Sequence, residues 1–119
     1  MGVVVTDAAL IDRLEAMLTQ AARKGQLMTY AEVARALCVP PPYVIHQTAE
    51  AIEALMRAHA AAGAPQLASM VISKARGGLP APGYFVLMAA LGIYDGPAEG
   101  PEARAFHQAE VARCLAAFA

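Results

Sequence analysis

The chain has 119 residues, of which 58% are apolar, and a formal net charge of −1. This length fits one domain with a buried core, and the apolar fraction excludes an intrinsically disordered chain. No apolar run approaches the roughly 18 residues that a membrane-spanning helix requires, and the near-neutral charge does not indicate a strongly basic surface for nucleic acid.

The amino-terminal stretch MGVVVTDAAL has no basic region and reaches Asp7 early, unlike a signal peptide. We therefore predict a cytoplasmic protein without a membrane partner, folded as a single domain over residues 1–119. The first predicted helix begins with a cap at Thr6 and runs through Lys24, and Gly25 ends it. Its apolar residues recur at helical spacing and form one stripe: Leu10, Ile11, Leu14, Met17, Leu18 and Ala21.

A helix-turn-helix is predicted next. Thr29 and Glu32 have the spacing of a capping box, which starts a short helix that ends near Cys38. The prolines at 40–42 forbid its continuation, and one of them can serve as the first residue of a third helix that closes at Gly63. The expected inward face of this third helix consists of Ile45, Thr48, Ile52, Leu55, Met56 and His59.

The segment LASMVIS, residues 67–73, is the predicted strand, and the glycine- and proline-rich KARGGLPAPG follows it as a turn. With a second short strand near Leu79, this hairpin would form a wing. An apolar stretch over 84–91, predicted to be a short helix or a buried segment, and a last helix from Pro101 to Ala117 complete the chain. The last helix is expected to bury Phe106, Val111, Cys114, Leu115 and Phe118. The predicted fold is mostly α with a small β hairpin, a winged-helix-like domain with extra amino- and carboxyl-terminal helices.

Two stretches carry a resemblance to a known family. TYAEVARALCV, residues 29–39, resembles the start of the DNA-binding domain of alkylguanine-DNA alkyltransferases and alkyltransferase-like proteins. VISKARGGLPAPGY, residues 71–84, is similar to the strand and glycine-rich loop after the active-site motif of that family. The resemblance covers about a quarter of the chain and implies a winged helix. A similar arrangement of helix, strand and glycine-rich turn occurs in small uncharacterised bacterial proteins.

The functional motifs of that family do not match. Its Pro-Cys-His-Arg motif would fall at residues 67–70, which read LASM, so no reactive cysteine and no activating histidine stand there. Alkyltransferase-like proteins keep the histidine and arginine, which this chain lacks. The arginine finger of the family would align near Tyr43 or Val44 and is absent from this chain. The resemblance therefore implies the fold and not alkyl repair.

Neither the cysteines nor the histidines indicate a catalytic or metal-binding site. Cys38 and Cys114 lie far apart and are predicted to be reduced, buried thiols. His59 and His107 have no Cys, Asp or second His at metal-ligand spacing, so we predict structural histidines and no metal or cofactor.

The predicted contact residues fall in two places. Tyr43, His46, Gln47 and Glu50 would face outward on the third helix, where Gln47 could bind an adenine edge, although Glu50 and Glu53 repel DNA. Lys74 and Arg76 on the wing could reach phosphate.

The first functional hypothesis is a non-enzymatic winged-helix-like binding module, a DNA-associated regulator. Its contact face would comprise Thr29, Tyr30, Tyr43, His46, Gln47, Lys74 and Arg76. The alternative is a protein–protein interaction module that keeps the fold and does not bind DNA. Because no acid–base pair or activated nucleophile is visible, an enzyme is not expected. If the apolar segment 84–91 is exposed in a monomer, a two-fold homodimer would cover it.

Overall fold

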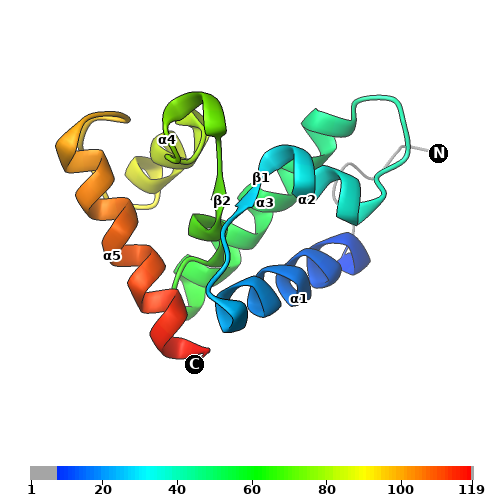
Figure 1. Cartoon of the computed structure of the whole chain (residues 1–119), viewed down its shortest axis with the longest axis horizontal. Helices are drawn as coiled ribbons and strands as arrows, with labels where there is room; N and C mark the ends of the chain where they lie inside the picture. The colour runs from blue at the N-terminus through cyan, green and yellow to red at the C-terminus, as the bar shows by residue number, and fades with distance from the viewer. Residues whose placement is uncertain (1–7, 119) are drawn as a thin grey trace.

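The computed structural model describes residues 8–118, and the predicted cap at Thr6 lies outside them. The described chain is mostly helical, with five α-helices and a two-stranded parallel sheet (Figure 1). The elements are α1 (Ala8–Lys24), β1 (Met28–Thr29), α2 (Tyr30–Leu37), α3 (Val44–Ala62), β2 (Val71–Ile72), α4 (Pro82–Ala90) and α5 (Pro101–Ala117), with 3₁₀ turns η1 (Leu67–Met70) and η2 (Lys74–Arg76). No described helix has the length and apolar character needed to cross a membrane.

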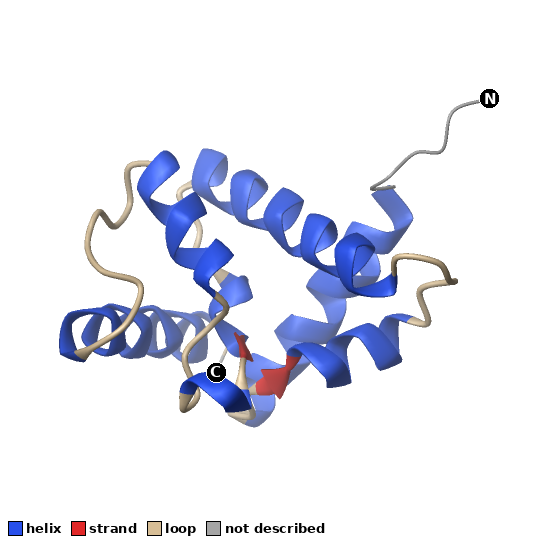
Figure 2. Cartoon of the chain, turned by 90° about the horizontal axis from the view of Figure 1, so that it is seen from above, coloured by secondary structure: helices blue, strands red, loops and turns tan. Residues whose placement is uncertain are grey.

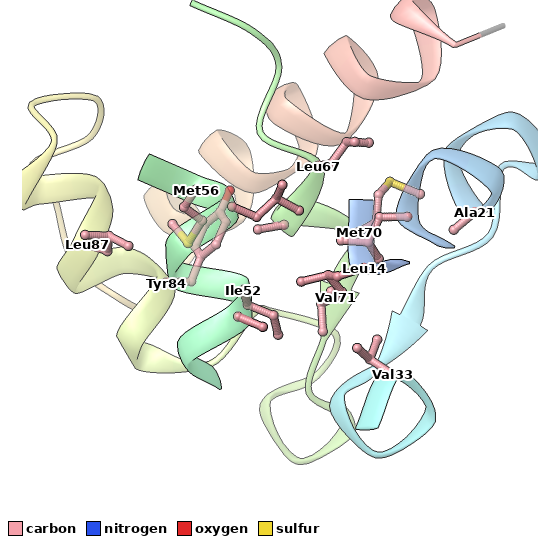
Figure 3. Close-up of a cluster of buried hydrophobic side chains, with 14 of the residues drawn as sticks. Leu14, Ala21, Val33, Ile52, Met56, Leu67, Met70, Val71, Tyr84 and Leu87 are labelled. Carbon is pink, nitrogen blue, oxygen red and sulfur yellow. The ribbon is translucent and has the colours of Figure 1, made fainter. Parts of the chain in front are cut away.

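The core lies between α1, α3 and the η1 turn. The predicted apolar stripe of α1 is confirmed, because Leu14 and Leu18 are fully buried and the other four residues are buried or packed against the core. Leu55 and Met56 of α3 are also fully buried, and α1, α3 and η1 all contact one another. Met56, Leu67 and Met70 lie in the same cluster as Leu14 (Figure 3). Burial of these large side chains, each contributing about 1.5–3 kcal/mol, supplies most of the stability of the domain.

The capping box at the start of α2 is confirmed. The Glu32 amide donates to the Thr29 hydroxyl at 3.2 Å, and the Thr29 amide donates to the Glu32 carboxylate at 2.8 Å. Two orphan amide groups of the helix end are thereby satisfied. The helix ends at Leu37, where Cys38 adopts a left-handed conformation with φ of 53°. This end agrees with the predicted stop before the prolines.

The start of α3 differs from the prediction. None of the three prolines enters the helix; they precede Tyr43, which has φ of 65° and acts as the amino-terminal cap, so α3 begins at Val44. Ile45 was expected to face inward, but its exposed fraction is 83%. The expected interior positions from Thr48 to His59 are buried. In the first turn of α3, Ile45 therefore faces solvent while Val44 packs against the core.

The predicted strand over 67–73 is mostly wrong. Its first four residues form the buried η1 turn, and only Val71–Ile72 is a strand. That strand pairs in parallel with β1, Met28 opposite Val71 and Thr29 opposite Ile72 (Figure 2). The expected antiparallel hairpin is reduced to one bridge between Ser73 and Leu79. The two segments that carry the family resemblance consequently lie side by side.

Helices α4 and α5 follow the predicted positions. Tyr84, Phe85, Leu87 and Met88 of α4 are buried, while Val86 is exposed. The buried face of α5 contains Cys114 as predicted. Its other buried residues, Ala103, His107 and Glu110, were not predicted, and Phe106, Val111, Leu115 and Phe118 are only partly buried.

The capping box gives a test of this part of the fold. We expect Thr29→Ala to lower the free energy of unfolding by about 1 kcal/mol, because the Glu32 amide loses its partner. The matched control is Thr19→Ala. The Thr19 hydroxyl donates only to the Glu15 carbonyl within α1. That change should stay within about 0.5 kcal/mol. Urea unfolding of both variants makes the comparison, and equal losses would contradict the role of the cap.

Candidate functional site

The seven predicted contact residues do not form one face. Tyr43, His46 and Gln47 lie at the start of α3, whereas Thr29, Tyr30 and Lys74 line a hollow at the amino-terminal end of α2. Arg76 belongs to neither group.

Tyr43 and His46 of the first group lie in a largely exposed segment, residues 40–46, which we call the α3 tip, and Gln47 directly follows it. Pro40, Pro41 and Pro42 are exposed, and the exposed fraction of Tyr43 is 75%. Gln47, which was predicted to face outward, is half-buried, and its side-chain amide donates to the carbonyl oxygens of Pro40 at 3.0 Å and Pro42 at 2.8 Å. These two bonds hold the proline segment against the start of the helix and leave Tyr43 and Ile45 at its surface. The Gln47 amide nitrogen is therefore occupied in the fold.

The charged groups that follow on α3 are arranged in pairs. The His46 imidazole contacts the Glu50 carboxylate one turn later. Arg57 lies 3.8 Å from Glu53 in the same way. Exposed pairs of this kind contribute little to stability. Their consequence is local: the exposed face of α3 carries no cation that lacks a neighbouring carboxylate.

The second group surrounds a hollow of about 500 Å³. Its lining consists of Thr29, Tyr30, Ala31, Glu32, Arg35, Ile72, Ser73 and Lys74. Lys74 and Arg35 are exposed there. Tyr30 has a structural contact, because its hydroxyl accepts a hydrogen bond from the Ala81 amide at 3.1 Å. Burial raises the pKa of the Tyr30 phenol, so this group stays neutral at physiological pH.

Arg76 was predicted to be a loop cation, but it binds the protein itself. Its guanidinium donates to the carbonyl oxygens of Pro80 and Ala98, each at 2.5 Å, and lies 5.9 Å from the centre of the Phe85 ring. These contacts join the glycine-rich turn to α4 and to the loop before α5. Arg76 consequently stabilises the turn and is not free to reach a phosphate.

The η1 turn occupies the positions where the family motif would stand, and all four of its residues are buried. The Ser69 hydroxyl and the Tyr84 hydroxyl share a hydrogen bond of 2.5 Å. His107 donates from Nε2 to the Ser69 carbonyl oxygen at 2.8 Å and does not contact the hydroxyl. The three groups therefore fix the turn against α4 and α5, and they do not form a nucleophile–base pair.

A second buried polar group anchors the same turn. The Gln66 backbone amide donates to the Glu110 carboxylate at 3.1 Å, and the other oxygen of that carboxylate accepts from Arg113 at 2.6 Å. Cys114 donates from Sγ to the Gln66 carbonyl oxygen at 3.3 Å. Burial raises the pKa of the Cys114 thiol to about 11, so the thiol stays protonated at neutral pH.

The remaining thiol and histidine predictions have mixed outcomes. Cys38 is exposed, contrary to the prediction, because the left-handed residue after α2 lies at the surface. His59 is a structural histidine as predicted: it is nearly buried and donates from Nε2 to the Glu15 carboxylate at 2.9 Å, linking α3 to α1. Within residues 8–118, no cluster of three or more His, Cys, Asp or Glu side chains is placed to hold a metal ion.

Comparisons with family models, curated proteins and solved structures find no match for this chain.

His107 predicts a pH dependence of stability. Burial lowers its pKa below the usual value near 6.5, so below that pH the unfolded chain binds a proton that the folded chain rejects. We therefore expect the free energy of unfolding to fall as the pH decreases through this window. The control, His107→Gln, keeps an amide donor without an ionisable group and should show a shallower decline. Urea unfolding between about pH 7 and pH 5 measures both slopes, and parallel curves would contradict the assignment.

Proposed function

We propose that this chain is a non-enzymatic, winged-helix-like binding module and that its partner is another protein. Support for the winged-helix interpretation comes from the order and packing of α1, α2 and α3 and from the turn that the Ser73–Leu79 bridge closes after β2. The resemblance to the alkyltransferase DNA-binding domain adds to it, since β1 and β2 bring its two segments together.

The exposed apolar surface of the α3 tip is the observation that carries the proposal. In helix-turn-helix proteins the start of the second helix contacts base edges, through arginine, lysine or amide side chains. Here that position presents the Tyr43 phenol and the Ile45 side chain, with exposed fractions of 75% and 83%. Exposed aromatic and aliphatic side chains on a rigid segment are typical of the central contacts of protein interfaces.

Charge supports a protein partner over DNA at this surface. The carboxylates of Glu50 and Glu53 follow the tip on α3 and would lie toward the phosphates of a bound duplex. Fewer of the predicted DNA-contacting side chains are available to a duplex, since Gln47 binds the carbonyl oxygens of the proline segment and Arg76 binds two carbonyl oxygens.

Duplex DNA is the second candidate, and one observation favours it. Lys74 and Arg35 are exposed at the hollow beside the amino-terminal end of α2, where a phosphate would also meet the positive end of the helix dipole. This interpretation predicts that Lys74→Ala weakens binding to a random duplex and reduces its salt dependence. Fluorescence anisotropy at low and moderate salt measures both effects.

The protein-binding proposal is tested by photo-cross-linking from the α3 tip. With benzoylphenylalanine at position 45, we expect a discrete protein adduct in the cells that encode the chain, because a docked partner would cover that side chain. The matched control carries the same group at Ala61, which is exposed at the other end of α3. Tyr43→Asp should abolish the adduct formed from position 45. The same adducts from both positions, or adducts with nucleic acid alone, would contradict the proposal.

A further inference from the structure

Three hollows with shared lining residues lie along residues 27–29, the segment that contains the short strand β1 between the carboxyl end of α1 and the amino end of α2 (Figure 1). The hollow at α2 shares Glu32 with a second one of about 350 Å³ beside the end of α1. The second shares Leu27 with a third, of about 300 Å³, between the glycine-rich turn and α5. We refer to the three together as the β1 groove.

The charges that line the β1 groove are mostly positive. Lys24, Arg35, Lys74 and Arg104 line it, against the single carboxylate of Glu32. His107 adds no charge, since burial lowers its pKa. Hydrogen bonds from Thr29 lower the pKa of the Glu32 carboxyl, which keeps that carboxylate ionised and engaged with the backbone. The groove is therefore cationic, although the whole chain has a net charge of −1.

The uncharged lining, or floor, of the groove combines aliphatic side chains with the amide and hydroxyl groups of Gln20, Gln26, Gln108, Thr29 and Ser73. It includes Met17, Leu27, Met28, Ile72 and Val111. Leu27 is 42% exposed and separates two of the hollows. The aromatic rings of the lining are Tyr30, whose hydroxyl is bonded to Ala81, and the nearly buried His107.

The charge and the lining of the groove favour an acidic peptide over single-stranded nucleic acid and duplex DNA. Single-stranded nucleic acid binds through bases stacked on exposed aromatic rings, which this floor does not offer. Duplex DNA is read by elements that protrude into its grooves, whereas this surface is hollowed. An extended peptide matches both properties, because its alternate side chains point to opposite sides. Carboxylates can then meet the rim while aliphatic side chains lie on the floor.

We infer that the β1 groove docks an extended acidic segment of a partner protein, in which carboxylate and aliphatic side chains alternate. The inference rests on the proposed protein-binding function, but it concerns a surface separate from the α3 tip. Lys74 at the α2 hollow and Arg104 at the α5 hollow, which both border the glycine-rich turn, would receive carboxylates, and Leu27 would contact apolar side chains.

The test uses the full chain and a fluorescein-labelled synthetic peptide in which glutamate alternates with valine. We expect saturable anisotropy that weakens with added salt, and no binding of the matched peptide with glutamine in place of glutamate. Lys74→Glu should weaken binding about tenfold, since it places like charges together. The control Arg57→Glu makes the same change of charge on exposed α3, outside the groove, and should have little effect. Circular dichroism verifies that both variants fold.

Three outcomes would overturn the inference. These are absence of binding at low salt, equal weakening by Lys74→Glu and Arg57→Glu, and displacement of the peptide by random duplex DNA at lower concentration. The last outcome would assign the groove to nucleic acid. Because the cross-linking test concerns position 45 and this one concerns position 74, failure of either proposal is distinguishable from failure of the other.

Discussion

The parallel pairing of β1 with β2 is the contact on which the arrangement of the β1 groove depends. It joins segments far apart in the chain, and such a closure costs conformational entropy that buried contacts must offset. Val71 is fully buried and packs with the core, which supplies part of that stabilisation (Figure 3). Because of this pairing, the capped start of α2 lies beside the residues that follow β2, and Tyr30 reaches the Ala81 amide. The β1 groove exists only in this arrangement.

Hydrogen bonds within the fold occupy several arginine side chains, and the other basic side chains are the ones that a partner could contact. Arg13 donates to the Leu37 carbonyl oxygen at 2.7 Å, Arg76 donates to two carbonyl oxygens beside the glycine-rich turn, and Arg113 donates to the Glu110 carboxylate of its own helix. A guanidinium presents several donors in a fixed plane, so it can satisfy carbonyl groups at the ends of turns and helices. Lys24, Lys74 and Arg35 remain at the groove, where Arg104 donates one hydrogen bond to the Gly77 carbonyl oxygen at 3.3 Å, whereas Arg57 on α3 lies beside Glu53. The α3 tip and the β1 groove are therefore suited to different segments of a partner protein.

Sequence reasoning predicts the helices well, since each has strong local signals. The stripe on α1, the Thr29–Glu32 capping box and Pro101 at the start of α5 all depend on neighbouring residues. The strand was less predictable. A short apolar run such as residues 67–73 fits a buried turn as well as a strand, and the two-residue β1 has no periodicity to detect. The site residues were the least predictable, because tertiary contacts decide whether Gln47 and Arg76 face solvent or bind carbonyl oxygens. Ile45 is exposed in the first turn of α3, after the left-handed Tyr43, and no local pattern indicated either feature.

The central claim is that the start of α3 is a protein-contact surface and does not read DNA. The most direct measurement is an amide nitrogen–proton NMR titration of the full chain with a random DNA duplex at low salt. Our account predicts unchanged resonances for residues 43–50, with any shifts confined to the surroundings of Lys74 and Arg35. Saturable shifts at His46 and Gln47, weakening with salt, would contradict it and restore α3 as a DNA-reading helix.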